Sequence, residues 1–500
     1  VGGRLNMLRP YLPLPFIEVS HLLSSVVGLW LMFLARGVFR RMETAFHMAQ
    51  WMLCGGILFS LVKGFDYEEA GILGVILVVL RASQGAFYRK GSLTWQFSAA
   101  WLGTIVIGVA GSMWLGMFAF KHVNYSHDLW GEFAYGSDVS RTLRSTMAVT
   151  ILLIGFLVLE CIRRVHPKES AKPTNIFTVR TIVGRSLRTE ANLALLGDKR
   201  FLMSGEEDAF VMYQIHGRSW VSMGDPVGPE RSWEPLLWQY RSLCDQYDGW
   251  PVFYQVGATH LPLYLDMGLA LLKLGEEARV DLREFSLEGR NRKELRYAYR
   301  RSAKEGALFE VVPANQVNGI MEELRQVSDE WLKEKNTAEK GFSVGQFSEV
   351  YLSQFDCAVI RWEGRIVGFA NIWMAPEGQE ISVDLMRHRT SIPHGSMDFL
   401  FTHLMLWGKE QGYRWFNLGM APLSGLQNHP LSSVWNQIGT FIFRHGEHFY
   451  NFEGLRTYKE KFDPVWTPKY LAAPGGLALP RMLFDVAALV SGGTKEIFHK

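Results

Sequence analysis

The most informative stretch for the fold of the C-terminal part of the chain is Ala358-Val-Ile-Arg-Trp-Glu-Gly-Arg-Ile-Val-Gly-Phe-Ala-Asn-Ile-Trp373. Its two runs of β-branched, aromatic and apolar residues flank Glu363-Gly364, so the stretch predicts a β-hairpin with a glycine in its turn. The stretch from Ala209 to Gly224 has the same plan and turns at His216-Gly217. Helix and strand patterns follow each hairpin, at 231–248 and 252–256 after the first, and at 380–387, 396–411 and 415–418 after the second. The sequence therefore predicts two similar α+β units.

This repeated order resembles the acyltransferase fold of the GCN5-related N-acetyltransferases (the GNAT fold), present twice. We expect a first GNAT-like subdomain at 166–305, a second, catalytic subdomain at 306–475 and a C-terminal tail at 476–500. Enzymes with this fold bind acetyl-CoA at a Gly-rich turn before the third helix. The equivalent stretch here, Arg389-Thr-Ser-Ile-Pro-His-Gly-Ser-Met-Asp398, has one glycine and one proline. An acyl donor other than CoA is therefore expected, although a helix N-terminus at this point can still receive an anion.

Residues 1–165 differ in character and predict a membrane α-helical domain. Five apolar stretches are each near the ~20 residues that cross a bilayer core, at about 15–35, 46–65, 69–88, 97–119 and 145–163. Basic residues follow the first, third and fifth stretches, which predicts that these segments and the soluble part lie in the cytoplasm; they are Arg36, Arg40, Arg41, Arg89, Lys90, Arg163, Arg164 and Lys168. Five spans leave Val1 on the outer side, so we expect further spans upstream.

The composition gives little support to several other kinds of site. A net charge of +3 over 500 residues gives no bulk signal for a charged partner. The four cysteines are scattered without a C-x-x-C pair, so neither a disulfide framework nor a zinc site is expected. The sequence also lacks G-x-S-x-G, H-E-x-x-H and Walker motifs, so a covalent serine mechanism has no support. We therefore predict no metal and no cofactor.

Asp384-Leu-Met-Arg387 lies at the end of a predicted strand and carries the first candidate site. Positions three apart on a regular strand face opposite sides, so both charged residues enter one site only if the strand ends or bends there. One interpretation is a structural Asp–Arg pair. The other is a carboxylate that holds an amine or positions a nucleophile, beside a cation that stabilises a developing oxyanion.

The segment from Tyr450 to Trp466 carries the second candidate site. Arg456, Lys459 and Glu460 have i, i+3, i+4 spacing and can share one helical face. A solvated amphipathic helix is one interpretation. The surrounding aromatic residues favour a packed helix instead, in which Lys459 contacts phosphate or stabilises charge at a transferred ester.

The run from Arg290 to Lys304 is strongly basic and carries the third candidate site. Arg292, Arg296 and Arg300 recur at every fourth position, with Lys293 and Lys304 beside them and tyrosines interleaved. Such a helix suits a nucleic-acid phosphate backbone or anionic lipid headgroups. A solvated charged face remains the alternative.

Taken together, the chain resembles the bacterial lysylphosphatidylglycerol synthase–flippase family, also called multiple peptide resistance factor. The matching stretches span most of residues 200–470, with two more in the membrane part; they are Gly224-Asp-Pro-Val-Gly228, Trp331-Leu, Glu339-Lys-Gly-Phe-Ser343, Asp384-Leu-Met-Arg387, Met397-Asp-Phe-Leu400, Asn417-Leu-Gly-Met-Ala-Pro-Leu423, Tyr450–Phe462, Val19–Gly28 and Lys63–Ala70. The family's membrane domain is longer, so the resemblance covers only its C-terminal part.

The resemblance implies a reaction at the cytoplasmic face of the bacterial membrane. An aminoacyl group, usually lysyl, passes from aminoacyl-tRNA to a glycerol hydroxyl of phosphatidylglycerol. The membrane domain then moves the cationic lipid outward, which lowers the attraction for cationic antimicrobial peptides. The implied catalytic residues are Asp384, Arg387 and Lys459; the implied substrate-binding residues are Glu339, Trp331, Met397, Arg456 and Tyr458.

The implied partners are aminoacyl-tRNA, phosphatidylglycerol and membrane lipids, with a homo-oligomer left open. The tRNA or anionic lipid is expected to contact Arg292, Lys293, Arg296, Arg300 and Lys304. An alanyl-specific version of the same transferase is one alternative. A membrane-anchored acetyltransferase that uses acyl-CoA is another, and a non-catalytic transporter with a lipid- or tRNA-binding sensor domain is the third.

Overall fold

A computed structural model describes residues 14–64, 66–89, 103, 105–111, 146, 148–150, 152–153, 175–335, 339–393, 395–426, 429 and 452–492. The chain divides into two compact units, one built mainly from Val1–Glu169 and the other from Ser170 onward. The expected domain boundary near residue 165 and the expected spans at 97–119 and 145–163 lie wholly or mostly outside the described residues.

The N-terminal unit contains three described helices, α2 (Leu14–Phe39), α3 (Glu43–Gly64) and α4 (Tyr67–Ala82), then the short η1 (Gln84–Ala86). Within its described residues, Leu22–Phe39 and Glu43–Val62 are long and apolar enough to cross a membrane. Helix α4, at the expected third span, has 16 residues, fewer than the ~20 that cross a bilayer core. Two membrane-length helices therefore agree with the prediction, and the complete bundle stays a prediction.

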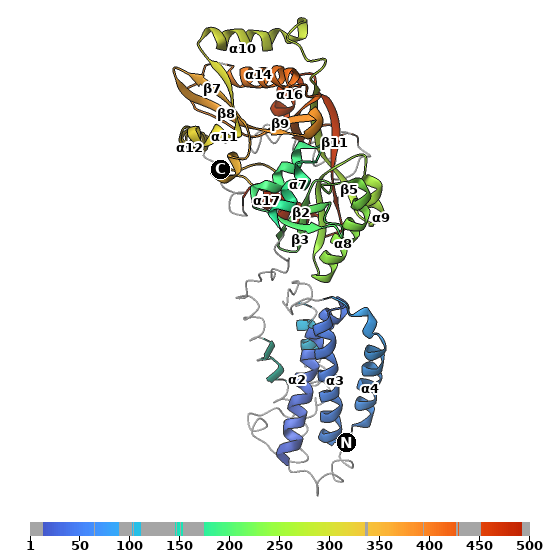
Figure 1. The fold of residues 1–500 in the computed structure, drawn as a ribbon. Coiled ribbons are helices and arrows are strands. Elements are labelled where there is room, and N and C mark those ends of the chain that lie inside the picture. The colour runs from blue at the N-terminus through green and yellow to red at the C-terminus, as the bar shows by residue number, and fades with distance from the viewer. Residues whose placement is uncertain are drawn as a thin grey trace. The chain divides into compact units, whose positions relative to one another are not determined.

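The C-terminal unit is a mixed α+β structure around one sheet (Figure 1). The sheet has 11 strands in the order β1-β2-β3-β4-β11-β5-β10-β9-β8-β7-β6. Its strands are β1 (Arg200–Met203), β2 (Phe210–His216), β3 (Ser219–Met223), β4 (Trp250–Gly257), β5 (Ala270–Asp281), β6 (Leu308–Val312), β7 (Cys357–Trp362), β8 (Arg365–Met374), β9 (Glu380–His388), β10 (Trp415–Pro422) and β11 (Val465–Ala473).

The described helices of this unit connect or cover those strands. They are α7 (Ile176–Val183), α8 (Trp233–Gln246), α9 (Leu261–Asp266), α10 (Lys293–Lys304), α11 (Ala314–Val317), α12 (Met321–Lys335), α13 (Glu349–Leu352), α14 (Ser396–Glu410), α16 (Phe452–Glu460) and α17 (Leu479–Val490), with the 3-10 helices η3 (Thr189–Leu196), η4 (Glu230–Ser232), η5 (Arg290–Arg292), η6 (Asn318–Ile320) and η7 (Pro376–Gly378).

The two halves of the sheet repeat one plan, as the sequence predicts. The hairpin β2–β3 pairs His216 with Ser219, and the hairpin β7–β8 pairs Trp362 with Arg365. In each half an antiparallel strand then runs through a helix into a parallel neighbour, β3 to β4 through α8 and β9 to β10 through α14. Both predicted hairpins and the elements after them are confirmed, but the two hairpins hold different places in the plan. The hairpin β2–β3 leads directly into α8, whereas β9 follows β7–β8 before α14, so β7–β8 corresponds to β1–β2.

The last strand joins the halves into one sheet. Strand β11 lies between β4 and β5, and β5 pairs on its other edge with β10. After β11, in the segment expected as a tail, α17 packs on β2, β3 and β4 and fully buries Met482. The chain's end therefore completes the first half of the sheet.

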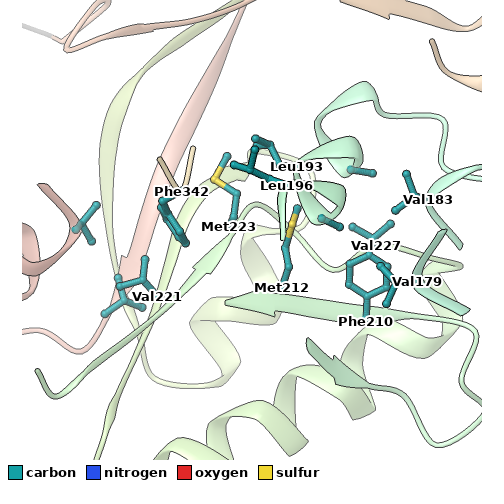
Figure 2. Packing of buried hydrophobic residues seen from close by; sticks show 14 of the residues in the cluster. Val179, Val183, Leu193, Leu196, Phe210, Met212, Val221, Met223, Val227 and Phe342 are labelled. Atoms are coloured by element: carbon teal, nitrogen blue, oxygen red, sulfur yellow. The ribbon is translucent and has the colours of Figure 1, made fainter. Parts of the chain in front are cut away.

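Hydrophobic clusters cover the sheet. One cluster belongs largely to the first half, where Phe210, Met212, Val221 and Met223 are buried together with Phe342 from the second half (Figure 2). In the second half, α14 packs on one face through Phe399, Leu400 and Leu404. Helices α12 and α13 cover a separate cluster that contains Leu385 of β9. The side chains described next lie on the side of β9 that faces α12 and α13.

Candidate functional site

Strand β9 carries a β-bulge at Asp384. Ile372 of β8 pairs with Val383 and Ala370 pairs with Met386, so Asn371 lies opposite two residues, Asp384 and Leu385. The Asn371 side-chain oxygen accepts a hydrogen bond from the Leu385 amide at 2.8 Å. A bulge adds one residue to a strand and re-aims the following side chains. The bulge brings Asp384 and Arg387 to the same face of the sheet. Strand β9 therefore has the bend that these two residues need in order to enter one site.

Both oxygens of the Asp384 carboxylate are held by neighbouring groups. Oδ1 accepts a hydrogen bond from the Gly345 amide and Oδ2 accepts one from the Tyr351 hydroxyl, both at 2.7 Å. A side chain at position 345 would collide with this carboxylate, so the approach requires glycine. Burial of the carboxylate raises the pKa of Asp384 to about 6, although the two hydrogen bonds favour the ionised form and lower the pKa.

Arg387, Glu339 and Trp331 form one cluster, in which Arg387 pairs with Glu339; the structural Asp384–Arg387 pair considered from the sequence is not formed between these two described residues. The Arg387 guanidinium donates to both Glu339 oxygens, at 2.9 and 2.6 Å, and to the Ser328 hydroxyl. It also stacks 5.2 Å from the centre of the Trp331 ring. The Arg387 side chain is 4% exposed and the Glu339 side chain 31%. The paired arginine therefore holds a partly accessible carboxylate near the surface.

Helix α16 carries a second group of predicted residues, which contacts β5, β10 and β11. The Lys459 ammonium donates to the Gly419 and Met420 carbonyl oxygens, both at 2.9 Å. Burial lowers the pKa of Lys459 to about 8, and nearby Glu277 opposes that shift. Arg456 pairs with Glu276 at 2.6 Å and stacks on Trp466. This helix is packed rather than solvated, as the aromatic residues suggested.

Met397 and Tyr458 both pack against the α14 cluster. The Tyr458 ring lies 6.0 Å from that of Phe401 and 5.8 Å from that of Phe462. Burial, and then the Asp398 carboxylate, raise the pKa of the Tyr458 hydroxyl well above its ordinary value. The contacts of Met397 and Tyr458 show that both residues pack in the protein's core, and their role in substrate binding stays a prediction.

The basic helix α10 presents two different sides. Arg292 donates to the Lys461 carbonyl at 2.6 Å, and Arg296 donates to the carbonyls of Leu287 and Gly289. The exposed face consists instead of Lys293, Tyr297, Arg300 and Lys304, at i, i+4, i+7 and i+11. The three arginines that the sequence places at every fourth position therefore do not share one face. Arg292 and Arg296 bind the protein's own backbone, and Arg300 belongs to the exposed α10 face.

The first half contains a cavity of about 870 Å³, lined by residues that include Arg188, Asp225 and Lys469. Asp225 belongs to the Gly224–Gly228 stretch and accepts hydrogen bonds from the Tyr264 hydroxyl at 2.6 Å and the Gly257 amide at 2.9 Å. Lys469 pairs with Glu190 and Glu277 at 3.2 and 3.3 Å. Arg188 pairs with Asp225 at 3.3 Å, and none of the candidate catalytic residues lines the cavity. Within the described residues no group of three or more His, Cys, Asp or Glu is arranged to hold a metal ion.

Sequence reasoning missed several residues that hold Asp384. Tyr351 and Gly345 contact it directly, and Lys199 acts on its charge. Gly345 stands two residues after the Glu339–Ser343 stretch, which is a usable signal. Nothing in the local pattern around Tyr351 or Lys199 indicates the contact, because it depends on how distant segments pack.

Comparisons with known proteins agree with this architecture. The sequence profile of the family described as phosphatidylglycerol lysyltransferase, C-terminal, matches residues 180–473. The phosphatidylglycerol lysyltransferase of Bacillus subtilis (strain 168) is 33% identical over 500 aligned residues, which cover 97% of this chain and 57% of that protein. That of Staphylococcus aureus (strain MRSA252) is 37% identical over 282 residues, which cover 56% of this chain and 33% of that protein. The chain thus matches about half or less of these relatives' length.

Two solved structures resemble the C-terminal unit. The structure of L-PGS from Bacillus licheniformis is 41% identical with a TM-score of 0.57, and the match covers 65% of this chain and 99% of that one. A C-terminal domain (DUF2156) from Agrobacterium fabrum is 43% identical with a TM-score of 0.59, over 64% of this chain and 99% of that one. Because the family profile matches more than half of its residues, the chain belongs to the family of phosphatidylglycerol lysyltransferase C-terminal domains.

Proposed function

We propose that the chain transfers a lysyl group from lysyl-tRNA to a glycerol hydroxyl of phosphatidylglycerol, as a tandem acyltransferase of the GNAT type. Family membership supports the reaction class. The observation that carries the assignment is Asp384, a partly buried carboxylate with a pKa of about 6 on a bulged strand. A carboxylate with such a pKa is mostly ionised at neutral pH and accepts a proton readily.

The reaction needs a proton acceptor more than a covalent nucleophile, because the aminoacyl ester is already activated. The lipid hydroxyl oxygen forms a new ester bond with the lysyl carbonyl carbon, and the bond from that carbon to the tRNA ribose oxygen breaks. Asp384 accepts the hydroxyl proton and returns it to the leaving ribose oxygen. Gly345 and Tyr351 hold the carboxylate in place for both transfers.

Glu339 and Trp331 are proposed to recognise the positively charged lysyl side chain. The Glu339 carboxylate is 31% exposed, and Arg387 fixes its plane with two hydrogen bonds. An ammonium group can still approach the remaining lone pairs of the carboxylate and the aromatic face beside it. Arg387 then acts mainly by orienting Glu339, because its terminal nitrogens already bind Glu339 and Ser328.

Lys459 is proposed to act next to the transferred ester while holding strand β10. Two of its ammonium hydrogens are directed at the Gly419 and Met420 oxygens, which leaves one for an ester or phosphate oxygen. Arg456, Tyr458 and Met397 are proposed to shape this side of the substrate site through their packing around α16 and α14.

The exposed α10 face is proposed to receive the tRNA. Three cations and Tyr297, which is 62% exposed, suit a phosphate backbone with an unpaired base beside it. The N-terminal unit is proposed to be a partial lipid-translocating domain in the bacterial cytoplasmic membrane, with the C-terminal unit in the cytoplasm. Its two membrane-length helices, and the basic residues Arg36, Arg40 and Arg41 at the end of the first, support this orientation.

The test is a transfer assay with the full chain in phosphatidylglycerol vesicles. Labelled lysyl-tRNA, labelled alanyl-tRNA and labelled acetyl-CoA are offered separately, and the lipid fraction is counted. The proposal expects label in the lipid from lysyl-tRNA, and none when phosphatidylglycerol is replaced by phosphatidylcholine. Lipid label from alanyl-tRNA alone would reassign the amino acid, and label from acetyl-CoA alone would overturn the proposal.

A further inference from the structure

Asp198 and Lys199 form a buried pair immediately before β1, in the first half of the sheet. The Lys199 ammonium donates to Asp198 Oδ1 at 2.7 Å, and the Lys199 side chain is 0% exposed. Burying an ammonium costs free energy unless it is paired, so the pair requires both members. No step of the proposed transfer reaction uses either residue.

The second oxygen of Asp198 holds a loop from the other half. Asp198 Oδ2 accepts hydrogen bonds from the Phe342 amide at 3.1 Å and from the Gln214 side chain at 2.8 Å. Phe342 has a φ of 61°, a left-handed conformation that is uncommon for a bulky residue. Its ring is 1% exposed and lies in the first-half cluster near Met223 (Figure 2), with the Lys199 ammonium 5.7 Å from its centre.

Four contacts fix the loop 339–345. At its two ends Glu339 binds Arg387 and the Gly345 amide binds Asp384, and both partners lie on β9. In its middle the Gly341 amide donates to the Val490 carbonyl oxygen at 3.3 Å, and the Phe342 amide donates to Asp198. A loop held at its middle in an otherwise disfavoured conformation has little freedom at its two ends.

We propose that Asp198 and Lys199 are positioning residues that fix the loop 339–345 and, through it, the groups that hold Asp384. The kinetic test of this inference rests on the proposed transferase function, whereas its hydrogen-exchange test does not. Asp198 holds Phe342, and so places the Gly345 amide against the carboxylate. Lys199 pairs with Asp198 and so holds it in place; burial lowers the pKa of Lys199, and the Asp198 carboxylate opposes that shift.

The electrostatic part follows from the groups that face Asp384. Burial raises the pKa of Asp384; the Tyr351 and Gly345 hydrogen bonds and then Lys199 lower it, and Asp198 raises it. Replacing Lys199 by a neutral side chain of similar length removes one lowering influence, so the pKa of Asp384 rises above about 6. A smaller fraction is then ionised at a given pH, and the acid limb of the pH–rate profile moves to higher pH.

The kinetic test compares Lys199→Met, Lys199→Arg and the exposed control Lys333→Met in the full chain. Lys199→Met is expected to move the acid limb of kcat/KM upward by about half a unit or more, a shift typical of a nearby charge in a protein. Lys199→Arg keeps the charge and is expected to restore the limb, whereas Lys333→Met leaves it unchanged. A limb that stays in place in Lys199→Met overturns the electrostatic part.

The structural test measures hydrogen exchange of the peptide that contains residues 339–346, with or without substrate. Asp198→Ala is expected to speed exchange there at least tenfold, and the exposed control Asp329→Ala is expected to leave it unchanged. Unchanged exchange in a folded Asp198→Ala protein overturns the positioning role. If the wild-type chain transfers no lysyl group at all, the proposed function fails, and this exchange result still decides the role of Asp198.

Discussion

Asp384 and Arg387 lie three positions apart on β9, yet their side chains reach the same face of the sheet. The extra residue in the bulge opposite Asn371 changes the alternation between them. Asp384 then meets Tyr351 of α13, and Arg387 meets Ser328 of α12. The bulge thus brings the Asp384 carboxylate to the same face of β9 as the Glu339–Arg387 pair.

The pH dependence of transfer should report the Asp384 carboxylate. Its pKa is raised from the ordinary 3.8 to about 6 by burial. If the ionised form is the active base, kcat/KM falls about tenfold per unit as pH drops below about 6. The measurement is a pH–rate profile with lysyl-tRNA and phosphatidylglycerol vesicles, with the ester's own hydrolysis subtracted. A flat profile between pH 5 and 7 would assign the base role elsewhere.

Gly345→Ala should disturb Asp384 without changing any charged group. The added methyl group meets the Asp384 carboxylate, so either the loop or the carboxylate must move. Overpacking of this kind costs ~1–3 kcal/mol of stability, and transfer should fall by a factor of ten or more. Gly319→Ala is the matched control, because a methyl group there meets nothing within 4 Å. Urea unfolding and initial rates check both effects, and equal rates in the two variants contradict the account.

Arg387→Lys should fail to replace arginine although it keeps the charge. A lysine ammonium cannot make the two parallel bonds that the guanidinium makes to Glu339, nor stack in the same way on Trp331. We expect a lower unfolding midpoint and a raised KM for lysyl-tRNA with a smaller effect on kcat. Steady-state kinetics with varied lysyl-tRNA give the two constants. Wild-type KM in Arg387→Lys would show that the paired geometry is unnecessary.

The exposed α10 face should bind tRNA, whereas the inner arginines should stabilise the fold. Joint replacement of Lys293, Arg300 and Lys304 by alanine should raise the Kd for tRNA. It should also reduce the salt dependence of binding, by roughly 0.7–0.9 in the log–log slope per lost phosphate contact. Replacement of Arg292 and Arg296 should instead lower the unfolding midpoint, because they bind backbone carbonyls. Binding titrations at several salt concentrations separate the two sets, and a reversed pattern would assign the tRNA surface elsewhere.

Local patterns predicted much of the fold, because hairpins and helices are encoded within short windows. Both hairpins and the α14–β10 pair follow from alternation and turn residues near Gly217 and Gly364. The position of β11 between β4 and β5 could not be read this way, since its partners lie about two hundred residues away. The tail likewise gave no sign that α17 completes the first-half core.

The sequence named part of the candidate site but not its geometry. Asp384, Arg387, Glu339 and Trp331 were named and lie on or beside β9, whereas Tyr351 and Gly345, which hold Asp384, were not named. Asp384 and Arg387 share a face of the sheet only because of the bulge, and the bulge arises from the pairing of β9 with β8. On α10, buried Leu295, Ala298 and Ser302 decide which side faces the protein, and the charged row alone did not show that Arg292 and Arg296 bind the protein's own carbonyl oxygens.

The most direct test of the central claim is lysyl transfer by Asp384→Asn in phosphatidylglycerol vesicles. The amide keeps the shape of the carboxylate but cannot accept the hydroxyl proton, so the initial rate should fall by a factor of ~10²–10⁴. Asp329→Asn, an exposed acid on α12, is the matched control and should keep the wild-type rate. A folded Asp384→Asn protein that labels phosphatidylglycerol at the wild-type rate would contradict the assignment of Asp384 as the proton acceptor.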